Sequence, residues 1–279
     1  MATPTRTSHT LAGVLGDLAV DVRTAERRHA APAVLVVHGF KGFKDWGMFP
    51  PFAERLARAG FTAVAVTLSG AGVDAAGAFS FPERFGHNTF SAEQRDLDVL
   101  LAALDGGELG VPRPSSVGIV GHSRGGGAAV LLAGRQRRIG ALVTWAAIAT
   151  VDRWPPAVLE QWRAAGRVDV VNSRTGEVLP LYRDTLDDIE ANRTGSLDIV
   201  AAAGRVAVPW LLIHGDADET VPVREAERLA VAATIPQFER LTVPGAGHTF
   251  GAVHPFAGAP ASLETVFDAS VRFLGRWLR

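Results

Sequence analysis

Residues 121–125 read G-H-S-R-G, which fits the pattern G-x-S-x-G. The β-branched run at residues 117–120 predicts a buried strand before this motif, and residues 126–133 predict a helix after it. A serine on such a sharp strand-to-helix turn has a strained backbone, and small neighbours prevent clashes there. Its hydroxyl then projects beside a helix N-terminus, which favours developing negative charge. Ser123 is therefore a candidate nucleophile, the alternative being a glycine-rich turn with an incidental serine.

A serine hydroxyl is a weak nucleophile that needs a general base, usually a histidine oriented by a carboxylate. His248 follows the last strand that the sequence predicts, residues 238–243, and so lies at the C-terminal edge of the expected sheet. Two carboxylates, Asp216 and Asp218, follow the strand before it. The chain order of the three groups is therefore serine, aspartate, histidine.

In these motifs and their order the chain resembles the α/β-hydrolases of the serine esterase, lipase and peptidase type, over about residues 34–278. The resemblance implies an α/β fold, a mostly parallel central sheet with helices on both faces. The acid segment of that family, G-x-x-D-x-x-V, corresponds to Gly215, Asp218 and Val221, which implies that Asp218 is the acid. Asp216 lies nearer the strand end and is expected to cap the turn, with the reverse assignment as the alternative.

The resemblance extends to residues 38–42, H-G-F-K-G, which match the H-G-x segment of the family. It implies that the backbone N–H groups of Phe40 and Arg124 form an oxyanion hole, which does not depend on side-chain identity. His38 is then expected to be a structural partner of this loop rather than a base. Structural or surface roles are also expected for His87, His122 and His254.

Strands and helices alternate along the chain, which predicts a mostly parallel sheet covered on both faces. Residues 11–15 and 18–23 predict a short antiparallel pair. Further strands are expected at residues 33–38, 61–68, 117–120, 141–147, 210–214 and 238–243, and helices at residues 49–59, 91–104, 126–133, 223–233 and 260–278. Ser91 and Gln94 predict a capping box for the second helix, and residues 69–90 a long glycine-rich loop.

Residues 150–205 interrupt this alternation. They are short for an independent core, so we expect one domain over residues 1–279 with a helical lid or cap inserted over the strand ends. Helices are expected near residues 157–165 and 186–191. Large aromatic side chains suit a mostly apolar ligand pocket, although they could also simply anchor the insertion to the body. The candidates for substrate contact are Trp145, Trp154, Trp162 and Tyr182.

The composition of the 279 residues excludes several classes of function. A net charge of −1 with interspersed signs provides no basic face for nucleic acid. The chain has no cysteine, which excludes disulfides, thiolate metal sites and cysteine nucleophiles. No metal or dinucleotide is expected, because His214 and Asp216 lack a second ligand cluster and residues 125–127 lack G-x-G-x-x-G. The polar residues 1–10 and the lack of a bilayer-length apolar run predict a cytoplasmic protein without a membrane span.

These features predict a serine hydrolase that cleaves carboxylic esters through an acyl-enzyme, without a cofactor. The loop at residues 38–42 and the insertion resemble the cinnamoyl-esterase and serine-aminopeptidase-like branches more than large secreted lipases, which implies a small-molecule ester as substrate. Similar folds also act as peptidases, thioesterases and acyltransferases, and these alternatives stay open, as does the oligomeric state. From a different class, a ligand-binding receptor with slow turnover would retain the same residues.

Overall fold

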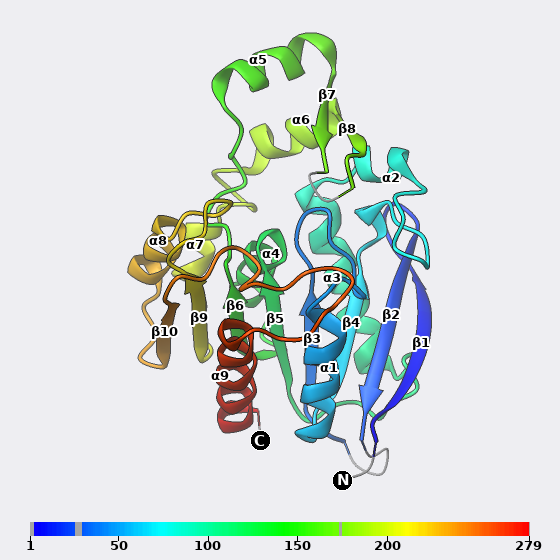
Figure 1. Ribbon diagram of the computed structural model, residues 1–279, viewed down its shortest axis with the longest axis vertical. Helices are drawn as coiled ribbons and strands as arrows, with labels where there is room; N and C mark the ends of the chain where they lie inside the picture. Colours follow the sequence, from blue (N-terminus) through cyan, green and yellow to red (C-terminus); the bar gives the residue numbers. More distant parts are fainter. Residues whose placement is uncertain (1–2, 26–29, 173–174, 279) are drawn as a thin grey trace.

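The computed structural model describes residues 3–25, 30–172 and 175–278. At its centre is an eight-stranded sheet in the spatial order β1-β2-β4-β3-β5-β6-β9-β10 (Figure 1). β2 is antiparallel to both of its neighbours, and the remaining neighbouring pairs are parallel. The strands are β1 (Thr5–Ala12), β2 (Asp17–Thr24), β3 (Ala33–Val37), β4 (Thr62–Thr67), β5 (Val117–His122), β6 (Ile139–Trp145), β9 (Trp210–Gly215) and β10 (Phe238–Val243). The mostly parallel sheet expected from the sequence is confirmed.

The strands in the middle of the sheet are buried along their whole length. β3 reads A-V-L-V-V and β4 reads T-A-V-A-V-T, continuous runs that suit strands covered on both faces. The N-terminal pair is antiparallel as expected, but both strands are longer than the sequence indicated. Their outer residues are polar and exposed, so no apolar run in the sequence indicates how far these strands extend.

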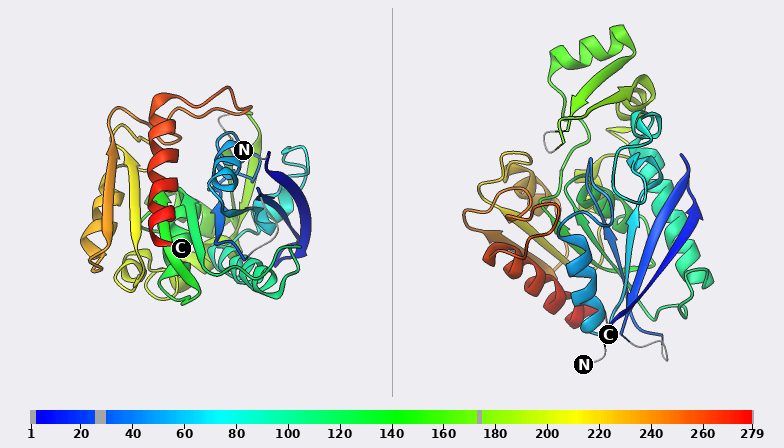
Figure 2. Two further views of the ribbon diagram at one scale, coloured as in Figure 1. Left: turned by 90° about the horizontal axis from the view of Figure 1, so that it is seen from below. Right: turned by 45° about the vertical axis from the view of Figure 1, so that its right-hand side comes forward.

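Helices cover both faces of the sheet (Figure 2). α1 (Phe49–Arg58) and α9 (Ala261–Trp277) pack on one face, where Phe52, Leu56 and Phe267 belong to one hydrophobic cluster. The other face is covered by α3 (Phe90–Gly106), α4 (Arg124–Ala133), α7 (Ile199–Ala203) and α8 (Arg224–Ala232). Because helices cover both faces of the sheet, a ligand can approach at the edge formed by the C-terminal ends of the strands.

Residues 69–90 are not a plain loop, because they contain η1 (Ser69–Ala71) and α2 (Pro82–Gly86). The predicted capping box of Ser91 and Gln94 is wrong. The hydroxyl of Thr89 caps α3 instead, accepting a hydrogen bond of 3.0 Å from a backbone N–H of the first turn. Ser91 donates its hydroxyl to Asp188 of α6 (Arg183–Asn192), a tertiary contact that a local motif cannot reveal.

Most of the segment 150–205 stands over the C-terminal ends of the parallel strands, whereas α7 at its end packs on the face of the sheet (Figure 1). It contains the expected helices α5 (Pro156–Ala165) and α6, and between them a hairpin of β7 (Arg167–Val171) and β8 (Val178–Tyr182) that the sequence did not predict. These elements share a small hydrophobic cluster with α2 that includes Phe85, Trp162 and Leu181. The hairpin also reaches the loop after β3, where Lys41 Nζ donates to the carbonyl of Val171 at 2.6 Å.

Candidate active site

Ser123 lies on the turn between β5 and α4 with φ 57° and ψ −120°, a conformation that non-glycine residues rarely adopt. Its N–H donates to the carbonyl of Trp145 on the neighbouring strand at 2.9 Å. The flanking glycines permit the turn. A Cβ on Gly121 would lie 2.2 Å from the carbonyl oxygen of Gly125, and one on Gly125 would lie 2.2 Å from that of His38. The turn therefore requires the small residues of the motif.

The loops after β5, β9 and β10 bring Ser123, Asp218 and His248 together. Nδ1 of His248 lies 2.8 Å from Oδ2 of Asp218, and Nε2 lies 2.9 Å from Oγ of Ser123. The Asp218 side chain is fully enclosed and that of His248 is 18% exposed. With a neutral ring, Nδ1–H donates to the carboxylate and Nε2 accepts from the hydroxyl. This arrangement can withdraw a proton from a serine as the hydroxyl attacks a carbonyl.

Four donors surround the buried carboxylate of Asp218. Burial opposes its ionisation, but hydrogen bonds from His214, His248 and the Val221 N–H hold the pKa of this carboxyl well below its usual value. Oδ1 accepts from the backbone N–H groups of Thr220 and Val221 at 2.9 and 2.8 Å. Asp218 is thus a fixed negative charge that can orient His248 and stabilise its cation.

Asp216 lies two residues away but takes no part in this chain of contacts. Its side chain accepts a hydrogen bond of 2.6 Å from the backbone N–H of Gly245, and the residue is exposed. This contact ties the loop after β9 to the loop after β10, which is the turn-capping role expected for it.

The loop after β3 packs directly against Ser123, since a Cβ on Gly39 would lie 2.9 Å from the Ser123 Cβ. Arg124 is the first residue of α4, so its N–H has no acceptor within the helix. Within the described residues, the Phe40 N–H also donates to no backbone or side-chain acceptor. Both amides expected to form an oxyanion hole are therefore available beside the serine.

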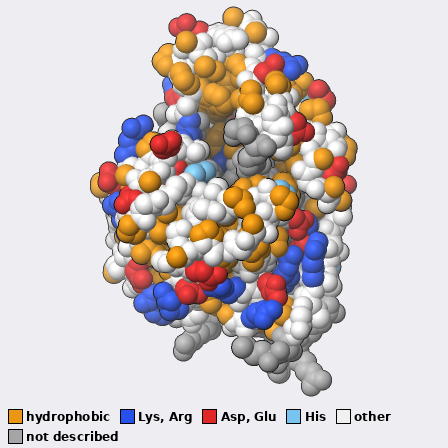
Figure 3. Space-filling view, viewed as in Figure 1, with side chains coloured by type: hydrophobic (Ala, Val, Ile, Leu, Met, Phe, Trp, Pro, Cys, Tyr) orange, Lys and Arg blue, Asp and Glu red, His pale blue; other side chains and the backbone are white. Residues whose placement is uncertain are grey.

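A cavity of about 220 Å³ opens at Ser123 under the segment 150–205. The space-filling view shows hydrophobic side chains gathered on this segment, above a hollow that separates it from the body (Figure 3). The apolar part of the cavity wall consists of Phe40, Phe90, Ile148, Val151, Trp154, Leu181, Ile189 and Val221. The polar part consists of Arg124, Arg153, Thr185 and Thr220. A mostly apolar pocket with a few placed polar groups is typical of a small-molecule site.

A family model described as the alpha/beta hydrolase family matches residues 34–260. The chain belongs to this family. The match includes the turn at Ser123 and the loops that carry Asp218 and His248, so family membership supports a hydrolase. A search of the curated proteins finds no match to this α/β hydrolase.

Solved structures of the same fold superpose over nearly the whole hydrolase. Est1E from Butyrivibrio proteoclasticus has a TM-score of 0.69 and 16% identity, covering 96% of this chain and 98% of its own. A dienelactone hydrolase from Anabaena variabilis has a TM-score of 0.67 and 18% identity, with 99% and 100% covered. The esterase domain of a Rhodothermus marinus protein has a TM-score of 0.66 and 17% identity, with 99% and 100% covered. At such identities the likeness establishes the fold alone.

Of the four aromatic residues considered as substrate contacts in this α/β hydrolase, only Trp154 lines the cavity. Trp162 is fully buried behind it, with ring centroids 5.4 Å apart. Tyr182 lies outside, donating its hydroxyl to Glu83. The interpretation of Trp145 as a contact is wrong, because its indole is fully buried on the α1 and α9 side of the sheet. Strand alternation at β6 sends this side chain away from the site.

Several cavity residues escaped the sequence analysis. Phe90 begins α3, and Leu181 and Thr185 come from the hairpin and α6, so no sequence motif connects them to Ser123. Arg124 was considered only for its backbone N–H, yet its guanidinium also packs against Phe40 and Phe90 of the cavity wall. Its position inside the motif is the one signal that could have suggested this.

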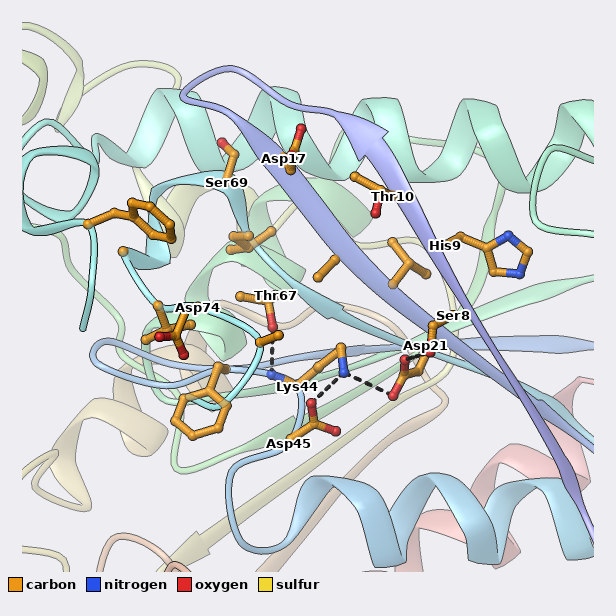
Figure 4. A pocket seen from close by; sticks show the side chains of 18 of the residues that line it. Ser8, His9, Thr10, Asp17, Asp21, Lys44, Asp45, Thr67, Ser69 and Asp74 are labelled. Atoms are coloured by element: carbon orange, nitrogen blue, oxygen red, sulfur yellow. Dashed lines mark hydrogen bonds and ion pairs between the residues drawn. The ribbon is translucent and has the colours of Figure 1, made fainter. Parts of the chain in front are cut away.

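A larger cleft of about 490 Å³ lies between β1, β2 and the loops after β3 and β4, and none of the three residues of the hydrogen-bonded chain lines it (Figure 4). Asp21 is fully buried there and accepts from Ser8 at 2.8 Å and Lys44 at 3.0 Å, with Arg6 at 2.9 Å. Burial opposes its ionisation, and these partners hold its pKa below the usual value. The charged groups already satisfy one another, which indicates a structural ion-pair cluster that holds the edge of the sheet.

The remaining histidines of the hydrolase have structural contacts. Burial lowers the pKa of His38 to about 4 and that of His122 to about 3. His38 bridges the carbonyl of Gly39 and the N–H of Leu68, and His122 contacts the carbonyl of His248 at 2.9 Å. The ring of His254 packs against Phe43 and Trp46, while that of His87 pairs with Asp184.

The neutral buried rings of His38 and His122 predict that acid destabilises the fold. In the unfolded chain both take a proton below about pH 6.5. Their contribution is complete above that pH and is lost as the pH falls toward the folded-state values. Between about pH 7 and about pH 5 each should lower the free energy of unfolding by about 2 kcal/mol. In urea unfolding, the free energy of unfolding of His122→Gln should change less between these two pH values than that of wild type, by about that amount. An unchanged difference in the His38→Gln/His122→Gln double variant would contradict this.

Within the described ranges, no group of three or more His, Asp or Glu side chains is arranged to hold a metal ion. No helix in the described part of the chain is long and apolar enough to cross a membrane.

Proposed function

We propose that this α/β hydrolase cleaves carboxylic esters of small molecules through an acyl-enzyme intermediate. The observation that carries the proposal is the continuous chain of contacts from Asp218 through His248 to Ser123, which opens on an apolar cavity. A serine polarised in this way beside free backbone amides is suited to acyl transfer.

In the first half of the reaction Ser123 Oγ attacks the ester carbonyl while His248 Nε2 takes the hydroxyl proton. The amides of Phe40 and Arg124 hold the oxyanion of the tetrahedral intermediate, each contributing on the order of 3 kcal/mol to the barrier reduction. The C–O bond then breaks, and the imidazolium returns its proton to the leaving alkoxide. Asp218 stabilises the imidazolium throughout.

In the second half a water molecule attacks the acyl-enzyme, with His248 again accepting a proton. The carboxylic acid leaves as the proton returns to Ser123. Apart from the ester and water, the cycle uses only Ser123, His248, Asp218 and the two backbone amides.

Stopped-flow release of p-nitrophenol from p-nitrophenyl butyrate tests this function. We expect a burst equal to the enzyme concentration, followed by sustained turnover. Release of one equivalent without turnover would instead indicate a ligand-binding receptor on a hydrolase fold. Matched thioesters and aminoacyl amides belong in the same experiment, because faster turnover of either would move the assignment to a thioesterase or a peptidase.

We further propose that residues 150–205, apart from α7, form a lid within a single domain and set the acyl preference. The lid supplies Val151, Arg153, Trp154, Leu181, Thr185 and Ile189 to the cavity wall but none of the reacting groups. Substitutions in the lid should therefore change the preference among esters more than the mechanism of hydrolysis.

Replacing Trp154 by alanine is expected to enlarge the cavity and favour longer acyl chains. The ratio of kcat/KM for p-nitrophenyl octanoate over p-nitrophenyl acetate should rise about tenfold, the effect of one or two hydrophobic contacts. Tyr182→Phe is the matched control, since its hydroxyl bonds Glu83 outside the cavity. Equal ratios in wild type and Trp154→Ala, with Ser123 still reactive toward a fluorophosphonate, would exclude a role of Trp154 in acyl selection.

A further inference from the structure

The side chain of Arg124 is held in one place at the cavity wall. It is 9% exposed, and its Nε donates to the Glu93 carboxylate at 2.9 Å. Nη2 reaches the carbonyl of Asn88 at 3.4 Å. The guanidinium carbon lies 3.7 Å from the ring centroid of Phe90 and 5.6 Å from that of Phe40. Because both rings line the cavity, the guanidinium lies between its apolar walls.

The guanidinium retains donors that the protein does not use. Arginine has five N–H groups. Among the described residues, Nε donates to Glu93 and Nη2 donates to the carbonyl of Asn88. Within that part of the chain Nη1 donates to no acceptor, and it is not among the polar atoms that the protein encloses without a partner. Because the guanidinium packs against Phe40 and Phe90, which both line the cavity, Nη1 is placed to meet a group bound there. An unmet donor beside the nucleophile can bind an acceptor on a ligand.

The charges around the cavity indicate which kind of acceptor fits. Glu93 is 6% exposed and neutralises Arg124. At the rim, Arg153 pairs with Glu225 at 3.2 Å and donates to the Thr220 carbonyl at 2.8 Å. Both cations therefore already have anionic partners. A ligand carboxylate would add an uncompensated charge to a mostly apolar space, whereas a neutral oxygen would not.

The size of the cavity limits the rest of the ligand. Apolar cavities of about 150 Å³ in other proteins hold benzene. The 220 Å³ available here accommodates a group of that bulk together with a short polar substituent. The apolar wall residues suit a hydrocarbon body, and Arg124 suits one oxygen on it.

We propose that the preferred acyl group has an apolar body that carries a neutral keto or ether oxygen, bound by the Arg124 guanidinium. This inference rests on the proposed ester hydrolysis at Ser123 and adds the chemistry of the acyl group. Arg124 then has two separate roles, its backbone N–H at the oxyanion and its side chain in recognition of the substrate.

Three p-nitrophenyl esters with acyl chains of equal length test the proposal: hexanoate, 5-oxohexanoate and 4-methoxybutanoate. After correction for hydroxide-catalysed rates, the two oxygenated esters should exceed hexanoate in kcat/KM by about tenfold or more. The glutarate half-ester, which presents a carboxylate at the same place, should not gain. Ratios near one for the oxygenated esters, or a preference for the half-ester, would overturn the proposal.

Two matched double variants assign the preference to a side chain. Arg124→Met/Glu93→Gln removes both members of the buried pair and leaves no unpaired buried charge. It should bring the oxygenated-to-hexanoate ratio to within about twofold of one, whatever happens to the absolute rate. Arg153→Met/Glu225→Gln removes the rim pair and should keep the wild-type ratio. Loss of the ratio in the rim variant alone would assign recognition to Arg153 and contradict the proposal.

A binding measurement separates this inference from the proposed function and needs no variant of Arg124. Calorimetric titration of Ser123→Ala with methyl 5-oxohexanoate and methyl hexanoate should show about tenfold tighter binding of the oxo ester. Equal binding would overturn the inference even if wild type hydrolyses esters. Tighter binding would support it even if hydrolysis at Ser123 failed its own test.

Discussion

Ser123→Ala should lower kcat for p-nitrophenyl esters by about 10⁴ to 10⁶, because it removes the hydroxyl that His248 contacts. The fold should be retained, since alanine and serine both have a Cβ and experience similar backbone strain at φ 57°. The loss in stability should be confined to the hydroxyl contact with His248, about 1 kcal/mol. Steady-state kinetics and urea unfolding of the purified variant measure both quantities.

The control for Ser123→Ala is Ser196→Ala, which changes an exposed serine whose hydroxyl donates to Asn192. It should keep wild-type rates. If Ser123→Ala retained more than a few per cent of the activity, a different nucleophile would have to be sought.

Asp218→Asn should lower kcat by about 10⁴ with little change in structure. Asparagine keeps the shape of the side chain, but its amide cannot hold the imidazole in the tautomer that accepts the serine proton, nor stabilise the imidazolium. The buried carboxylate also loses the charge that His214, His248 and two backbone N–H groups now stabilise. The measurement is kcat for p-nitrophenyl butyrate across the pH range in which wild type is active.

Asp216→Asn is the matched control, because it makes the same chemical change two residues away. Its side chain contacts Gly245 rather than His248, so activity should fall by less than about threefold. The opposite ranking of the two variants would assign the acid to Asp216 and refute the geometry of this loop.

The fold and the hydrogen-bonded chain were accessible from the sequence because both depend on local patterns. Continuous apolar runs such as β3 predict buried parallel strands, and the glycines around Ser123 have no room for a Cβ. The resemblance to the family segment favoured Asp218 over Asp216 and left the reverse assignment open, since both follow β9. Only the structure shows that Asp218 faces His248 and that Asp216 bonds Gly245.

The cavity was not accessible in the same way, because its residues come from distant segments. The sequence indicated an aromatic pocket, but Trp145 faces the opposite side of the sheet and Trp162 lies behind Trp154. The β7–β8 hairpin was missed because its strands are short and partly exposed, so their pattern resembles that of a polar loop. The tertiary contacts of Phe90 and of the Arg124 side chain leave no periodic signal.

The most direct test of the central claim is covalent labelling with a fluorophosphonate, followed by intact-mass measurement and peptide mapping. The account predicts one adduct per chain, located on Ser123, with loss of ester hydrolysis in proportion to labelling. Ser123→Ala should acquire no adduct, and Asp218→Asn should label far more slowly than Asp216→Asn. Full hydrolysis by an unlabelled protein, or an adduct on a different serine, would contradict the account.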